Sequence, residues 1–213
     1  MTQRKIDYFT KALELDPNLS AAYEKRGMLY YFQENYPETI QDFQKAARLK
    51  PFNPETYVML GLAFMKQGNL DEAIANLSRA IELDTQGAGV YSYRSEAFRL
   101  KGMIEESIQD STMAIKLGGS GPTIGRAYTT RSKAYRELGD NESADADFKR
   151  ASKLDPEKYM YNMLTSTELL AGWAGESSSL KNVGRMGVAL IVALLFVVIF
   201  KLTMSTPKKD DDS

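Results

Sequence analysis

The chain has 213 residues, and its 27 basic and 28 acidic side chains give a formal net charge of −1. A general nucleic-acid-binding protein carries a clear excess of basic residues, which this chain lacks, so no nucleic-acid partner is expected. Cysteine and histidine are both absent, which excludes disulfides, thiol nucleophiles and the usual zinc ligands, and removes the commonest general base. We therefore expect no enzyme activity, no metal and no cofactor.

Residues 1–19 contain one predicted helix, and they are too polar for a signal peptide. Ile6, Phe9 and Leu13 recur at three- and four-residue steps and predict one apolar face. The segment matches the second half of a unit that repeats downstream, and its first half is missing. Three interpretations fit: a half-repeat that caps the array, an apolar edge that another subunit or a partner covers, or a chain that is cut at its start.

The stretch from Pro54 to Gly87 contains two helical patterns separated by a turn at Gly68, and copies of it recur along the chain. One such pair has too little core to fold alone, so the copies are expected to stack. Four columns keep a period of 34 residues with one step of 37: Tyr23, Tyr57, Tyr91 and Tyr128; Tyr30, Phe64, Phe98 and Tyr135; Gly27, Gly61, Ser95 and Ser132; and Ala12, Ala46, Ala80, Ala114 and Ala151.

These columns resemble the tetratricopeptide repeat (TPR) family, whose unit is a helix–turn–helix of 34 residues. The resemblance covers about residues 5 to 158. It implies an all-α fold, in which a half-repeat, about four repeats and a capping helix form an α-solenoid. The four repeats are expected at 20–53, 54–87, 88–121 and 125–158.

Some positions depart from the pattern. The turn of the first repeat, Glu34-Asn35-Tyr36-Pro37, lacks the usual glycine. In the third repeat, Ser107 and Ser111 occupy positions where small apolar and aromatic residues normally pack. Residues 117–125, LGGSGPTIG, add three residues before the fourth repeat. Their glycines and proline predict either a tolerated loop insertion or a flexible bend in the solenoid.

Four segments follow the repeats. Residues 159–171 predict a helix that caps the last repeat, and the Gly- and Ser-rich residues 172–185 predict a flexible linker. Residues 188–200 include no polar residue, so we predict a single transmembrane helix over 186–204 and a short polar tail over 205–213. A buried helix of the solenoid is the alternative, but a soluble helix would show a polar face over this length.

An apolar segment so near the carboxyl end is typical of a tail-anchored, single-pass membrane protein. We expect the repeats to face the cytosol or cytoplasm, because no signal sequence precedes them. Basic residues flank the segment on both sides, so their distribution does not fix the orientation. A short span with such flanks resembles anchors of mitochondrial or plastid outer membranes, and a bacterial inner membrane is equally compatible.

The TPR resemblance also implies a concave groove, lined by the first helix of each repeat. Its apolar, methionine-rich front and basic rear predict a protein or peptide partner with an apolar and an acidic part. Several of these methionine and aromatic side chains are equally compatible with the core between repeats. The residues expected to contact the partner are Met28, Tyr31, Phe32, Val58, Met59, Leu62, Met65, Tyr93, Arg99, Arg126, Lys133 and Arg136.

The clamp by which some family members hold chaperone C-terminal tails needs Lys, Asn, Asn, Lys and Arg in five slots. A chaperone tail is not an expected partner, because neither possible frame fits this pattern. The slots hold Glu24, Met28, Met59, Gly89 and Tyr93 in one frame, and Val58, Leu62, Tyr93, Arg126 and Thr130 in the next.

Together these features predict a membrane-anchored adaptor or scaffold that binds a protein or peptide in its groove and acts in docking or assembly at a membrane surface. The alternative is a tail-anchored receptor of an organelle outer membrane, or an adaptor for membrane remodelling or division. The sequence identifies neither the partner, the membrane nor the oligomeric state.

Overall fold

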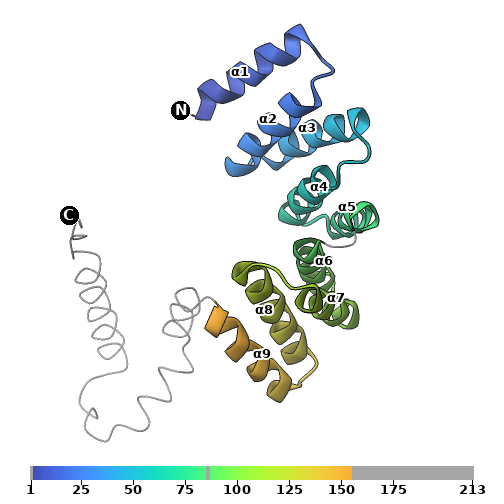
Figure 1. The fold of residues 1–213 in the computed structure, drawn as a ribbon, viewed down its shortest axis with the longest axis vertical. Coiled ribbons are helices and arrows are strands. Elements are labelled where there is room, and N and C mark those ends of the chain that lie inside the picture. Colours follow the sequence, from blue (N-terminus) through green and yellow to red (C-terminus); the bar gives the residue numbers. More distant parts are fainter. Residues whose placement is uncertain (1, 85–86, 155–213) are drawn as a thin grey trace, which may run out of the picture. The chain divides into compact units, whose positions relative to one another are not determined.

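A computed structural model describes residues 2–84 and 87–154, and these ranges contain nine helices and no strand (Figure 1). The helices are α1 (Thr2–Leu15), α2 (Ser20–Phe32), α3 (Tyr36–Leu49), α4 (Pro54–Gln67), α5 (Leu70–Leu83), α6 (Ala88–Leu100), α7 (Ile104–Leu117), α8 (Gly121–Glu137) and α9 (Asn141–Leu154).

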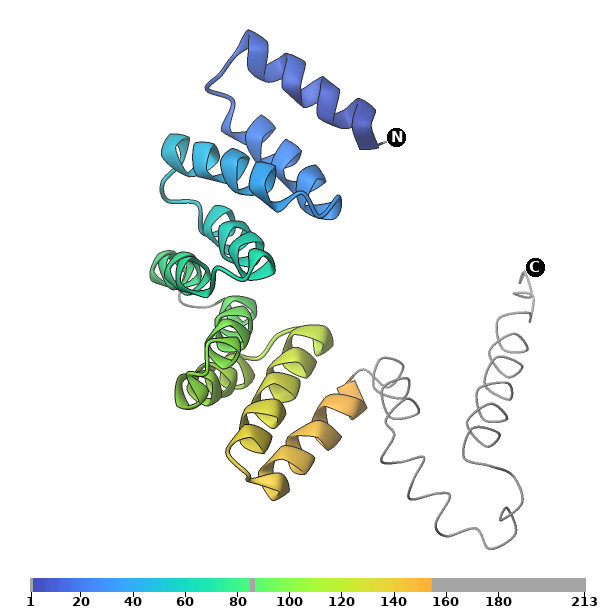
Figure 2. The ribbon, with the colours of Figure 1, turned by 180° about the vertical axis from the view of Figure 1, so that it is seen from behind.

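The helices pack in chain order as a series of pairs (Figures 1 and 2). Helix α2 packs on α3, α4 on α5, α6 on α7 and α8 on α9, while α1 packs on α2 without a partner before it among the described residues. The first helices of successive pairs also contact each other, most extensively α6 and α8. The predicted all-α solenoid of stacked helix pairs is therefore confirmed.

Small residues let the paired helices approach closely. Ala46, Ala80 and Ala114 are fully buried in the second helices. A Cβ atom added to Gly61 would lie 2.5 Å from the Cγ atom of Leu77, so the α4–α5 contact requires glycine at this position. The small-residue and alanine columns that recur from repeat to repeat thus mark the places where helices contact each other in the core.

The serines of the third repeat form a buried polar contact between α6 and α7. Ser95, Ser107 and Ser111 are all fully buried. The Ser95 hydroxyl donates to the backbone oxygen of Ser107 at 3.0 Å, and its oxygen lies 2.5 Å from the Ser111 hydroxyl. Because these hydroxyls satisfy one another, the departure from the apolar pattern does not leave an unpaired group here.

The turns between paired helices need a left-handed backbone. Gly68, Gly102 and Gly139 have φ values of 82°, 84° and 82°. In the first repeat Glu34 occupies the same place with φ 59°, a conformation that L residues adopt only at a cost. The missing glycine therefore changes the residue but not the geometry of the turn.

The residues added before the fourth repeat do not all form a loop. Helix α8 begins at Gly121, four residues before the predicted start of the repeat, and Pro122 lies in its first turn. Proline is favoured at this place because its φ is already helical and its missing N–H is not needed there. Only residues 118–120 remain outside helices α7 and α8.

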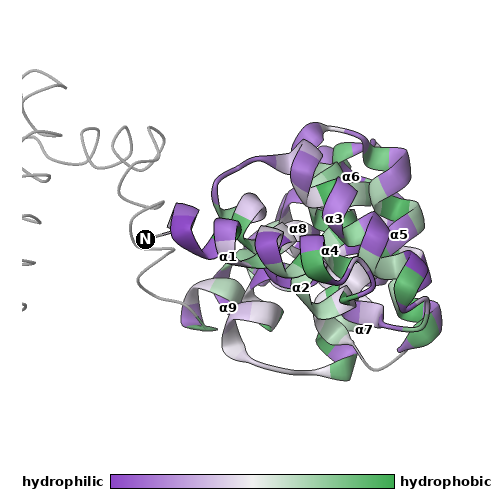
Figure 3. Cartoon of the chain, turned by 90° about the horizontal axis from the view of Figure 1, so that it is seen from above, coloured by the Kyte–Doolittle hydropathy of each residue, from purple (hydrophilic) through white to green (hydrophobic). Residues whose placement is uncertain are grey.

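Hydrophilic and hydrophobic residues are intermixed along the described helices (Figure 3). Within residues 2–84 and 87–154, each helix falls short of the length or apolar character needed to span a membrane. The predicted capping helix, linker, transmembrane helix and polar tail, at 159–171, 172–185, 186–204 and 205–213, lie outside the described residues.

Candidate protein-binding groove

The same buried ion pair fixes the first helix in three of the repeats. In each, an arginine of the first helix makes two hydrogen bonds to an aspartate of the second helix, which lies 16 residues further on. The pairs are Arg26–Asp42, Arg94–Asp110 and Arg131–Asp147, with N–O distances of 2.7, 2.7 and 2.6 Å. This two-point geometry sets the rotation of the first helix, and hence which of its side chains face the groove.

Each of these arginines also reaches the preceding second helix, where it donates to a hydroxyl group: Thr10, Ser78 or Thr112. Two aromatic rings of its own helix flank it, with the guanidinium carbon 5.4–6.0 Å from the ring centroids. The sequence interpretation overlooked this set, although its arginines and aspartates keep the repeat spacing.

The side chains predicted to form the apolar half of the groove pack against the core on one side and are partly exposed on the other. Tyr31 and Met59 pack against the buried cluster of Ile40, Phe43, Leu60 and Ala63. The side chains that pack against the second buried cluster, Ala73, Leu77 and Ala97, include Val58, Met65 and Tyr93. All five keep part of their surface exposed, as does Leu62. These side chains therefore support the repeats and remain accessible to a partner.

Tyr31, Tyr93 and Arg126 face a common space, although they belong to three different repeats. The Arg126 guanidinium carbon lies 4.2 Å from the centroid of the Tyr93 ring. Burial raises the pKa of Tyr31, nearby Tyr36 and Tyr93 raise it further, and the charge of Arg126 opposes the shift. These interactions show that α2, α6 and α8 direct these predicted residues toward one face of the array.

The predicted basic half also contains two carboxylates, Glu96 and Glu137, that reduce its positive charge. Arg99 is paired with Glu96 at 2.8 Å and with Glu137 at 2.7 Å. These hydrogen bonds raise the pKa of Arg99. Burial acts to raise the pKa of Glu96, but Arg99, Lys133 and Thr130 outweigh it, and the pKa is lowered. An acidic ligand would have to compete with Glu96 and Glu137.

Arg136 does not join this group. It pairs with Asp145 of α9 at 3.0 Å, and its guanidinium carbon lies 5.8 Å from the centroid of the Phe148 ring. Its side chain therefore follows its own repeat partner, away from Arg99 and Arg126. A long arginine side chain on a helix can reach either neighbour, and the position number alone does not distinguish them.

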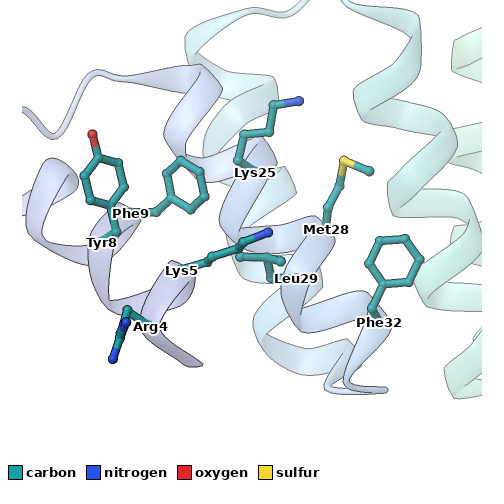
Figure 4. A pocket seen from close by; sticks show the side chains of 8 residues that line it. All are labelled: Arg4, Lys5, Tyr8, Phe9, Lys25, Met28, Leu29 and Phe32. Atoms are coloured by element: carbon teal, nitrogen blue, oxygen red, sulfur yellow. The ribbon is translucent and has the colours of Figure 1, made fainter. Parts of the chain in front are cut away.

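Met28 and Phe32 lie at the amino-terminal end of the array, where they line an open pocket between α1 and α2. Met28 is 36% exposed and Phe32 is 73% exposed. The pocket has a volume of about 720 Å³, and we call it the α1–α2 pocket (Figure 4). Its lining residues are Arg4, Lys5, Tyr8, Phe9, Lys25, Met28, Leu29 and Phe32.

The apolar edge predicted for the first segment is only partly exposed. Ile6 and Leu13 are buried, at 3% and 7% exposure, whereas Phe9 is half-buried and lines the α1–α2 pocket. The open surface therefore consists of Phe9 with its exposed neighbours Lys5 and Tyr8. In the described part of the chain, no group of three or more acidic side chains is placed to hold a metal ion.

Two family profiles match the chain. The profile described as TPR repeat matches residues 28–68 and 61–102, and the one described as tetratricopeptide repeat matches residues 125–158. Together these matches span about half of the sequence. A comparison with curated proteins gives no match.

Solved structures share the fold. The crystal structure of MamA is 28% identical with a TM-score of 0.65, over 73% of this chain and 90% of that chain. YrrB, described as a TPR protein with an unusual peptide-binding site, is 25% identical with a TM-score of 0.62, over 73% and 78%. The first TPR of Spaghetti (RPAP3), bound to an HSP90 peptide, is 22% identical with a TM-score of 0.53, over 56% and 93%, and shows the fold alone. The matched profiles and this architecture place the chain in the tetratricopeptide repeat family.

Proposed function

We propose that the chain is a protein-interaction scaffold whose groove binds a peptide segment of a partner protein, and that residues 186–204 hold it at a membrane. The main observation in favour of a binding groove is that Tyr31, Tyr93 and Arg126, from three repeats, lie on one face. Leu62 and Met65 are partly exposed and add apolar surface to the proposed groove. The likeness to YrrB, which is described as having a peptide-binding site, supports the same use of the fold.

The partner segment that fits best is mainly apolar, with polar groups toward α6 and α8. Rings and methionine side chains on α2 and α4 offer an adaptable apolar surface. Toward the rear, cations and carboxylates alternate, since Glu96 lies near Lys133 and Glu137 pairs with Arg99. We therefore propose that mixed charge, more than a purely acidic end, is recognised there. A chaperone C-terminal tail is not proposed, because the five clamp slots hold other residues.

The groove is tested with Leu62→Glu, because Leu62 is partly exposed and belongs to neither buried cluster. A charge at this place should reduce capture of partner proteins by the full chain at least about tenfold, through loss of apolar contact and desolvation of the new carboxylate. Ala75→Glu, at an exposed position of the second helix α5, is the matched control and should leave capture unchanged. If Leu62→Glu retains full capture while its circular dichroism matches the native chain, the groove does not bind the partner.

The membrane anchor rests on the uncharged run within residues 186–204. At about 1.5 Å per residue, a helix over the whole of residues 186–204 is roughly 28 Å long, close to the hydrocarbon thickness of about 30 Å. Replacing 186–204 by a Gly/Ser linker should move a tagged chain from the membrane fraction to the supernatant. External protease on intact membranes should digest the repeats, because the proposal places them on the cytosolic or cytoplasmic side. Retention of the linker variant in the membrane fraction would contradict the anchor.

A further inference from the structure

Helix α6 shows how this repeat array holds a first helix. On one side α7 contacts it, with Ser107 and Ser111 against Ser95, and Asp110 against Arg94. On the other side three side chains of α8 contact Tyr93, Glu96 and Arg99: they are Arg126, Thr130 and Glu137. A fourth α8 side chain, Lys133, attracts Glu96 by its charge.

The α1–α2 pocket repeats the α7–α8 arrangement without the helix. The alanine column relates α1 to α7 by 102 residues (Ala12 to Ala114), and the small-residue column relates α2 to α8 by 105 (Gly27 to Ser132). In this register Lys5, Tyr8 and Phe9 correspond to Ser107, Asp110 and Ser111, and Ala21, Lys25, Met28 and Phe32 correspond to Arg126, Thr130, Lys133 and Glu137. Six of the eight residues that line the pocket are therefore at positions whose counterparts on α7 and α8 interact with α6.

The same positions differ sharply in exposure. Asp110 and Thr130 are 7% and 3% exposed where α6 covers them. At the matching positions of the pocket, Tyr8 is 71% exposed and Lys25 is also exposed. Figure 4 shows these side chains on α1 and α2, with Lys5 extending from α1 toward Leu29. The pocket is thus an apolar surface with the register of a helix-binding site and nothing over it in the described residues.

The pocket is also electropositive. Arg4, Lys5 and Lys25 line it, and its lining includes no carboxylate. None of the three forms an ion pair with another described residue. The arginines of the interior are instead paired, as Arg94 is with Asp110. A helix that covers the pocket must therefore supply the negative charge itself.

We propose that the α1–α2 pocket binds an amphipathic, acidic α-helix of a partner protein. The alignment of α1 and α2 with α7 and α8 predicts the sequence pattern of this partner helix, with α6 as its template. A small residue, at the place of Ser95, faces Lys5 and Phe9. An acidic residue follows directly, as at Glu96, and meets Lys25. An apolar residue takes the place of Arg99, because Phe32 replaces Glu137. This inference rests on the proposed function, since it names a class of partner for a protein-interaction scaffold, but it uses residues of α1 outside the groove.

The probe is a fluorescein-labelled peptide with the α6 sequence Ala88–Leu100 that carries Arg94→Ala and Arg99→Leu, with a staple on its outer face because so short a helix is marginal alone. Its anisotropy is measured with the full chain in a non-ionic detergent. Glu96→Lys in the peptide should weaken binding by about three- to tenfold at low salt. Ser95→Phe in the peptide should abolish it, because α1 and the helix could no longer approach closely.

The matched protein variant is Lys5→Glu with Lys25→Glu, at two exposed positions where the fold is expected to tolerate the change. It should reverse the preference and bind the Glu96→Lys peptide better than the parent peptide, while Leu62→Glu should bind both as the native chain does. Equal binding of the two peptides by the native chain, or no effect of the lysine reversal, would overturn the inference. So would a loss of binding in Leu62→Glu alone, which would place the peptide in the groove and leave the proposed function standing.

Self-association provides one further test. Sedimentation of the full chain in the same detergent, with and without the lysine reversal, reports whether a second copy occupies the pocket. The inference expects the two proteins to have the same mass. An assembly that dissociates only in the reversed variant would show that a second copy is the occupant and would overturn the proposed partner helix.

Discussion

The second and third repeats have the same backbone plan, but different chemistry holds their helices together. In the second, Leu60 is buried and Gly61 fits against Leu77. In the third, the same two positions hold Arg94 and Ser95, which bind Asp110 and Ser111. Apolar packing and a satisfied polar network thus serve equally well at one place in the fold.

This difference extends to the groove. The first helix of the second repeat presents Leu62 and Met65, which have no charge to satisfy. The first helix of the third repeat presents Glu96 and Arg99, which already form an ion pair with each other. We infer that a partner gains more from apolar contact at α4 than from charge at α6, because new ion pairs there would have to replace existing ones.

The largest effect is expected from Asp110→Ala, which leaves the Arg94 guanidinium partly buried without its ion-pair partner. Loss of one member of such a pair should lower the free energy of unfolding by about 3–5 kcal/mol. The register equivalent in the second repeat is Asn76, which donates only to a backbone oxygen at the surface. Asn76→Ala is the control, and urea denaturation should find it nearly neutral. Similar losses in both variants would contradict the distinction between the repeats.

A smaller effect is expected from Gly61→Ala. The added Cβ would lie 2.5 Å from Leu77 Cγ, so α4 and α5 would have to separate, at a cost of about 1–3 kcal/mol. Gly89→Ala on α6 is the matched control, because nothing lies within 4 Å of its added Cβ. Thermal denaturation should show a lower midpoint for the first variant and no decrease for the second. A decrease of equal size in both would mean that close packing is not the reason for glycine at position 61.

The smallest effect is a pH dependence at Glu96. Its folded pKa lies below the ordinary value of 4.5, because Arg99 and Lys133 outweigh the burial. The stabilisation by Glu96 is therefore fully present above pH 4.5 and is lost as the pH falls through the lowered folded pKa. Glu96→Gln should remove this part of the acid sensitivity, which paired denaturation curves across that range can measure. If the two proteins lose stability in parallel below pH 4.5, Glu96 does not contribute in this way.

Helix content and pairing were predictable because columns of buried small residues and partly buried aromatic residues repeat at a fixed spacing. The ion pairs were harder to find, since a charged residue on a predicted helix is normally exposed. Their signal was present in the sequence, because Arg26 and Arg94 are separated by two repeat lengths, as are Asp42 and Asp110. A charged pair that recurs in register is better read as a buried contact than as surface charge.

The candidate groove was predictable only in part. Position numbers identified Tyr31, Tyr93 and Arg126, which the structure brings to one face. They did not show that Arg136 follows Asp145 of α9, because side-chain direction depends on a neighbour from the other helix. The sequence did not show that residues 121–124 begin helix α8, because glycine and proline mark both loops and helix starts.

The most direct test of the account places a photo-crosslinking amino acid at Leu62 in the groove or at Ala75 on the exposed side of α5, in otherwise identical full chains. Irradiation in the native membrane should join the partner to the chain from position 62 and not from position 75, because the proposal places the groove on the first helices. Crosslinks to the same partner with equal yield from both positions, or from position 75 alone, would contradict the claim that the first-helix face binds it.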